Sequence, residues 1–142
     1  MAANEEMSKM LRNARILYIA FLGAVLIDII ILVILPYIGL PIFARDDPFL
    51  TPVAAALGGV AVISFAIGVY VPRWMTRKSR KPQDLLRFHL VRGTFFHSLA
   101  HDGLILGILG TGWYVTLPFF AVSVAALILT FPTIERWKQM LK

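Results

Sequence analysis

Long apolar stretches alternate with short basic segments along the chain, and this pattern predicts helices that cross a membrane. A helix needs about 20 apolar residues to cross a hydrocarbon core about 30 Å thick. The uncharged stretch 103–134 is too long for a single crossing, and Gly110, Thr111 and Gly112 supply the residues of a tight turn inside it. The sequence therefore predicts four spans, over residues 16–35, 51–71, 90–109 and 113–131.

Prolines and acidic residues recur at matching places in these spans. Pro36, Pro72 and Pro132 follow the first, second and fourth spans, and we expect them to close the helices. The first and third spans each contain an aspartate, Asp28 and Asp102. We therefore expect one four-helix membrane domain over residues 1–142, built from two hairpins that resemble a duplicated unit. Any pair of hairpins with its basic residues on one side has similar features, so a duplication is not required.

Basic residues are distributed very unevenly about the predicted spans. Of the 14 Lys and Arg residues, 12 lie before the first span, between the second and third, or after the fourth. Arg92 lies in the first turn of the third span, on the same side, and only Arg45 lies in the opposite loop. Lys and Arg collect in cytoplasmic loops. This predicts a multi-pass protein of the inner (cytoplasmic) membrane with both ends in the cytoplasm. The basic cytoplasmic loop, residues 73–87, is expected to contact anionic lipid headgroups.

Composition agrees with a membrane protein and excludes several kinds of site. Of all residues 58% are hydrophobic and 15% are charged, whereas a soluble domain carries about 25% charged residues. The chain has no cysteine, which excludes disulfides, thiolate metal sites and cysteine nucleophiles. We attribute the net charge of +6 to membrane topology and expect no nucleic-acid partner.

The two aspartates in the spans are expected to lie at one depth in the bilayer. Each is the thirteenth residue of its predicted span, so each lies about 18 Å along its helix. His101 precedes Asp102 directly and shares this level. An ionisable group in the hydrocarbon core costs about 2.5–3.5 kcal/mol on insertion scales, so it normally faces the bundle interior and has a partner.

Polar residues of the third span gather on one helix face. Five of them fall within an arc of about 140°, because each residue advances by about 100° around a helix. The opposite side is apolar. His89 and Arg92 extend this polar face to the cytoplasmic end of the third span, which we call the mouth of the layer. The predicted polar layer, which is either a buried polar contact or a proton relay, comprises Asp28, Thr94, His97, Ser98, His101 and Asp102.

More than one role for this layer stays open at this point. Histidine and aspartate exchange protons near neutral pH, so the layer can serve as a proton or ion path. It can equally hold helices together, with Asp28 accepting a hydrogen bond from His97 or His101. Haem b is a weaker alternative, because all intramembrane histidines lie on one helix. Asp28, His97 and His101 could also hold zinc, but their spacing in the sequence is not diagnostic of a zinc site, so we predict no metal site.

No catalytic motif accompanies the polar layer. The sequence shows no nucleophilic triad pattern, phosphate-binding loop or dinucleotide fingerprint, so we predict no catalytic residues and expect no enzymatic activity from this chain alone. We expect a non-catalytic subunit that packs against other membrane subunits, or against copies of itself, in a larger inner-membrane complex. A small oligomeric proton-linked transporter or channel is the main alternative, and a haem-b-bearing membrane anchor of an electron-transfer complex is the third. Small residues over 54–61 are expected to let another helix approach closely.

Overall fold

The computed structural model describes residues 2–38, 49–78 and 81–141, and every regular element within these ranges is a helix. The all-helical class is therefore confirmed for these residues. Arg45 and positions 79–80 of the predicted basic loop lie outside the described residues. The elements are α1 (Ala2–Ile34), the 3₁₀ helix η1 (Leu35–Ile38), α2 (Leu50–Lys78), α3 (Pro82–Leu109), α4 (Trp113–Leu129) and α5 (Ile134–Leu141).

Two segments among the described residues are long and apolar enough to cross a membrane, Glu5–Ile38 and Leu50–Met75. The α4 helix is shorter and strongly apolar. The α3–α4 turn lies at the glycine pair of the sequence, since Gly110 and Gly112 have φ values of 91° and 83°. Glycine adopts this left-handed region without a Cβ clash, which allows the tight reversal.

The expectation that Pro72 closes the second helix is wrong, because α2 continues through it to Lys78. A proline inside a helix cannot donate to the carbonyl four residues earlier, here that of Gly68. Arg92 Nε of α3 donates a hydrogen bond to this Gly68 oxygen at 3.3 Å. The neighbouring helix thus supplies a donor for the carbonyl that Pro72 leaves without its usual partner.

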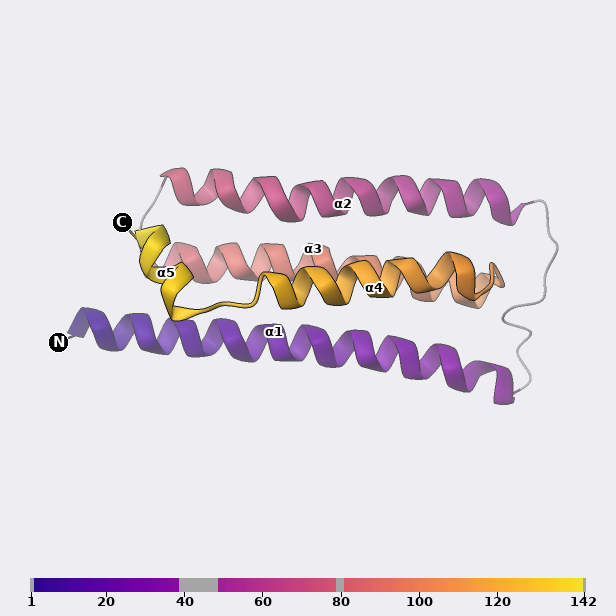
Figure 1. Cartoon of the computed structure of the whole chain (residues 1–142), viewed down its shortest axis with the longest axis horizontal. Coiled ribbons are helices and arrows are strands. Elements are labelled where there is room, and N and C mark those ends of the chain that lie inside the picture. Colours follow the sequence, from indigo (N-terminus) through magenta and orange to yellow (C-terminus); the bar gives the residue numbers. More distant parts are fainter. Residues whose placement is uncertain (1, 39–48, 79–80, 142) are drawn as a thin grey trace.

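The α3 helix lies at the centre of the bundle. It packs against α1, α2 and α4, and α1 also contacts α4. The four long helices run side by side, with both termini at one end and the α3–α4 turn at the other, and α5 turns across the bundle (Figure 1). We call the end that holds both termini the terminal end. The main core joins Tyr18, Val25 and Leu32 of α1 to Phe96 and Ala100 of α3 and to Phe120, Ala126 and Leu127 of α4.

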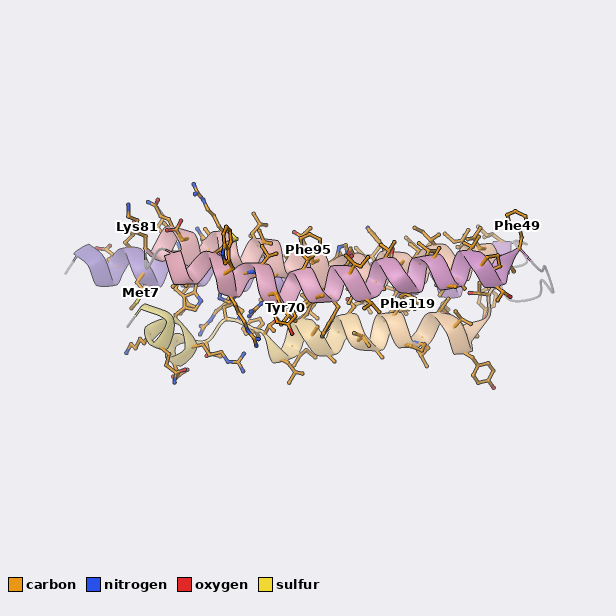
Figure 2. The ribbon with its side chains drawn as sticks, turned by 90° about the horizontal axis from the view of Figure 1, so that it is seen from above. Met7, Phe49, Tyr70, Lys81, Phe95 and Phe119 are labelled. Atoms are coloured by element: carbon orange, nitrogen blue, oxygen red, sulfur yellow. The ribbon has the colours of Figure 1, made fainter. Side chains whose placement is uncertain are left out.

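Most of α2 lies on the outside of this core. Figure 2 shows α2 lying over α3. Val62 and Tyr70 are among its large exposed side chains. A Cβ atom placed at Gly58 or Gly59 would have no neighbour within 4 Å. These two small residues therefore do not bring α2 into close contact with the rest of this chain.

Close helix contact depends instead on glycines of α3 and on Gly68 of α2, where a Cβ atom would lie 2.8 Å from the Phe96 ring of α3. A Cβ atom at Gly107 would collide with Leu32 of α1. At Gly103 it would lie 2.9 Å from Phe119 Cβ and 3.3 Å from the Thr116 carbonyl oxygen of α4. The Thr116 oxygen belongs to the helix backbone, so a side-chain rotation cannot relieve this contact.

We predict that Gly103→Ala destabilises the protein by about 1–3 kcal/mol, because the new methyl group must push α4 away from α3. The measurement is thermal unfolding of the chain purified in detergent. Gly58→Ala is the matched control, and alanine there should raise stability by up to about 1 kcal/mol through its higher helix propensity. Equal destabilisation by both substitutions would contradict the assigned contact between α3 and α4.

Candidate polar site between α1 and α3

Asp28 of α1 meets two histidines of α3. Its Oδ2 atom lies 2.9 Å from His101 Nδ1 and 3.8 Å from His97 Nε2. The two histidines are four residues apart, so they project from the same face of α3, and their ring centroids are 4.6 Å apart. The structure therefore places these three residues of the predicted layer at one level.

Exposure changes sharply across this cluster. The side chain of Asp28 is 6% exposed and that of His97 is 15% exposed, whereas that of His101 is 55% exposed. Phe21 of α1 lies against the His97 ring, at a centroid distance of 5.8 Å. The cluster thus leads from a buried carboxylate to an imidazole at the surface of the bundle.

Proximity in this cluster is not matched by hydrogen bonding. Asp28 Oδ2 and His97 Nε2 are buried and have no hydrogen-bond partner. His101 Nδ1 approaches to 2.9 Å and forms an ion pair with the carboxylate when its ring is protonated, but this contact is not a hydrogen bond. A buried carboxylate oxygen without a hydrogen bond is costly unless a positive charge compensates it, so the cluster requires either a protonated histidine or a further group.

The other predicted members of the layer do not join the cluster. Thr94 and Ser98 donate to carbonyls of their own helix, those of Leu90 at 3.0 Å and Phe95 at 2.8 Å. Asp102 is buried, and its Oδ2 atom has no hydrogen-bond partner. The predicted arc of α3 therefore crosses the boundary between the exposed and the buried faces of the helix, and only part of it faces α1.

His89, predicted at the mouth of the layer, belongs to a buried network at the terminal end of the bundle. Trp137 Nε1 of α5 donates to His89 Nε2 at 2.8 Å. Tyr18 OH lies 3.5 Å from His89 Nδ1 and 3.4 Å from the Thr130 hydroxyl. The His89 and Trp137 rings are stacked, with an interplanar angle of 10°. This network joins α1, α3, the end of α4 and α5.

The protonation state of His89 follows from these contacts. Because Trp137 N–H can only donate, Nε2 of His89 must accept, and the ring is neutral with its proton on Nδ1, facing Tyr18. Burial, followed by the positive charges of Arg92 and Arg136, lowers the pKa of His89 to about 3. Protonation would place a second N–H against the Trp137 donor and break this contact.

Sequence reasoning did not identify Tyr18, Thr130 or Trp137 as partners of His89. A tryptophan on the short polar helix after Pro132 was the available signal, because an indole N–H seeks an acceptor when it is buried. The separations along the chain, 71 residues from Tyr18 and 48 from Trp137, place these contacts beyond any local pattern.

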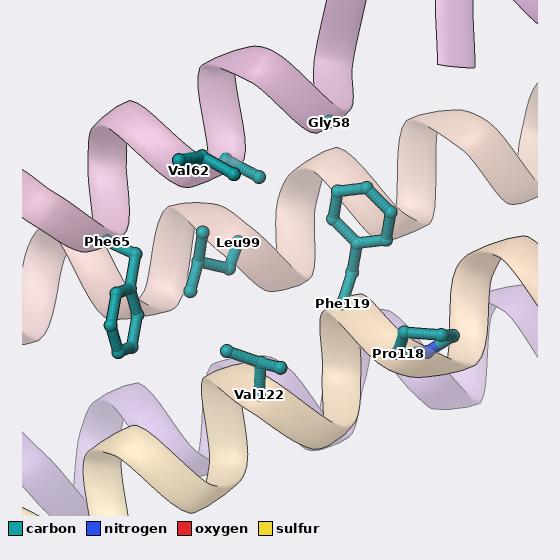
Figure 3. A pocket seen from close by; sticks show the side chains of 8 residues that line it. Gly58, Val62, Phe65, Leu99, Pro118, Phe119 and Val122 are labelled. Carbon is teal, nitrogen blue, oxygen red and sulfur yellow. The ribbon is translucent and has the colours of Figure 1, made fainter. Parts of the chain in front are cut away.

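A separate apolar groove lies between α2 and α4 (Figure 3). It has a volume of about 280 Å³ and includes Gly58 and Phe65 of α2, Leu99 of α3 and Pro118 of α4. Its lining is almost wholly apolar. It therefore offers space for apolar groups and is distinct from the polar cluster on the α1 side of α3.

Comparison with protein-family models, with curated proteins and with solved structures gives no match for this chain in any of the three.

We predict that lowering the pH below about 6.5 destabilises the fold through His89. The unfolded chain binds a proton at His89 near pH 6.5, whereas the folded chain does so only at about pH 3. The unfolded state therefore holds more protons between these values, and stability falls as the pH falls, by up to about 1.4 kcal/mol per pH unit. Thermal unfolding across this window measures the slope.

His89→Gln is the control for this effect, because its amide oxygen can still accept from Trp137 but the side chain does not titrate. His97, His101 and the carboxylates remain in both proteins, so the difference between the two slopes isolates His89. Identical slopes would contradict the buried neutral imidazole.

Proposed function

We propose that the chain is a non-catalytic integral membrane subunit that spans the inner membrane with α1–α4 and works inside a larger complex. Two helical segments are already long and apolar enough to cross a bilayer. The other two long helices, α3 and α4, lie alongside them in the same bundle (Figure 1). In this arrangement both ends of the chain lie in the cytoplasm.

The distribution of charge supports the proposed orientation. Within the part of the chain that the structure describes, several basic residues lie near the terminal end. They include Lys9 and Arg15 of α1, Arg87 of α3 and Lys138 of α5. At the opposite end, α4 begins directly after the α3–α4 turn with two aromatic residues, Trp113 and Tyr114. Basic residues on one side and aromatic rings at an interface are typical of a polytopic membrane protein.

The observation that carries the proposal of a partner is the half-exposed His101 beside the buried Asp28. His101 lies about 12 Å along α3 from its end at Leu109, a depth inside the hydrocarbon core of the proposed topology. A polar, ionisable surface at this depth is costly against acyl chains. A neighbouring subunit or a second copy that covers this face removes the cost.

Proton-linked transport by an oligomer is the second candidate, and one observation favours it. The cluster connects a carboxylate that is 6% exposed to an imidazole that is 55% exposed, which is the order of groups that a proton would pass on its way from the surface to a buried site. Transport requires proton flux from the purified chain in liposomes, whereas the subunit role does not. In both candidate functions, another subunit or a second copy covers the face of the bundle at His101.

The first prediction from this proposal concerns topology. The chain has no cysteine, so single substitutions report position without a background signal. A membrane-impermeant maleimide added to intact spheroplasts should label Tyr114→Cys, whose parent side chain is 97% exposed in the first turn of α4. Lys9→Cys and Gln139→Cys should react only after lysis. Labelling of all three in intact spheroplasts would overturn the four-span topology.

The second prediction concerns the covered face. Ile105 lies one turn after His101 on α3 and is 46% exposed. A photoreactive amino acid at Ile105 should cross-link to another polypeptide, or to a second copy, when native membranes are irradiated. Ile63 of α2, which is 60% exposed, serves as the control for crowding in the membrane. An Ile105 probe that reacts only with lipid would contradict the proposed partner.

A further inference from the structure

Three ligand-type atoms converge between α1 and α3. Asp28, His97 and His101 each offer one nitrogen or oxygen atom, and these atoms all lie within 4.8 Å of one another. From this convergence we infer that the three residues bind a divalent transition-metal ion of the zinc class. The spacing along the sequence did not indicate such a site, because its third ligand comes from a helix far away in the chain.

The separations suit a tetrahedral ion. With bonds of about 2.0–2.1 Å to nitrogen and oxygen, tetrahedral zinc holds two ligand atoms about 3.3 Å apart. The measured separations from Asp28 Oδ2, 2.9 Å to His101 and 3.8 Å to His97, lie on either side of this value. The two histidine nitrogens lie no more than 4.8 Å apart, so they must approach each other by up to about 1.5 Å for one ion to contact all three residues.

Hydrogen bonding within the cluster points the same way. If the cluster were only an ion pair, the carboxylate oxygen would be expected to accept an N–H from a histidine. Instead Asp28 Oδ2 and His97 Nε2 are both buried without a hydrogen-bond partner. A cation accepts electron pairs from the carboxylate and from neutral imidazoles at once, so one ion would satisfy both of these buried atoms.

The ligand set also limits the kind of metal. Two imidazoles and one carboxylate suit zinc and, by the same chemistry, copper, nickel or iron, whereas calcium and magnesium prefer sets of oxygen ligands. Three protein ligands leave the fourth tetrahedral position free for water or for an external ligand. Because His101 is half exposed, this position is accessible from the face that we propose a partner covers.

This inference deepens the proposed function, and it rests on that function only for the placement of the site inside the bilayer. Metal binding is a property of the single chain, whereas cross-linking at Ile105 tests the partner and needs no metal. Failure of one experiment therefore leaves the other interpretable.

The test is a zinc titration of the full-length chain, purified in detergent through a tag without histidine and first treated with a chelator. Competition with a chromophoric chelator should give one saturable zinc site per chain. Asp28→Asn and His101→Asn should each weaken zinc binding by at least about tenfold, since even second-shell changes at metal sites cost 10–100-fold. Co²⁺ should produce visible d–d absorption bands that disappear when zinc is added.

Asp102→Asn is the matched control, because it removes a buried carboxylate next to His101 that is not part of the cluster. Its zinc affinity should equal that of the wild type. His101→Asn keeps the test decisive if Asp28→Asn does not fold, because the His101 side chain is half exposed. Absence of saturable zinc binding by the folded wild-type chain would overturn the inference, as would unchanged affinity in His101→Asn.

Discussion

Desolvation of the Asp28 carboxylate constrains how α1 meets α3. A carboxylate in an otherwise apolar helix must find partners, because leaving it against hydrocarbon or an apolar core is expensive. His97 and His101 are the groups that approach its Oδ2 atom. This contact favours one height and one rotation of α1 on α3. The apolar core joins the same two helices to α4.

The helical architecture and the level of the polar cluster could be predicted from the sequence because both depend on local counting. Helix rise places Asp28 and His101 at one depth, and the glycines at 110 and 112 identify the turn between α3 and α4. Rotation about α3 was less informative. An arc of about 140° is wide enough to include the exposed Thr94 and the buried Asp102, so it could not separate residues that face α1 from those that do not.

Contacts between distant residues lay beyond prediction from the sequence. Pro72 has the appearance of a helix terminator, and nothing near it in the chain indicates that Arg92 donates to the Gly68 carbonyl. The network of Tyr18, His89 and Trp137 likewise combines three helices. In both cases a polar group is satisfied by a donor that only the tertiary fold brings near. Which polar groups pair therefore depends on how the other helices pack around the central α3.

The length of α4 has a consequence for the surrounding lipid. Its 17 residues extend about 26 Å, less than the hydrocarbon core of about 30 Å, whereas α1 and α2 are longer than the core. In the proposed topology this creates a negative hydrophobic mismatch on one side of the bundle only. The bilayer beside α4 would have to become thinner, or the whole bundle would have to tilt. Either change costs a fraction of a kcal/mol per ångström of mismatch. In that topology, the asymmetry would favour thin bilayer regions on the α4 side of the bundle.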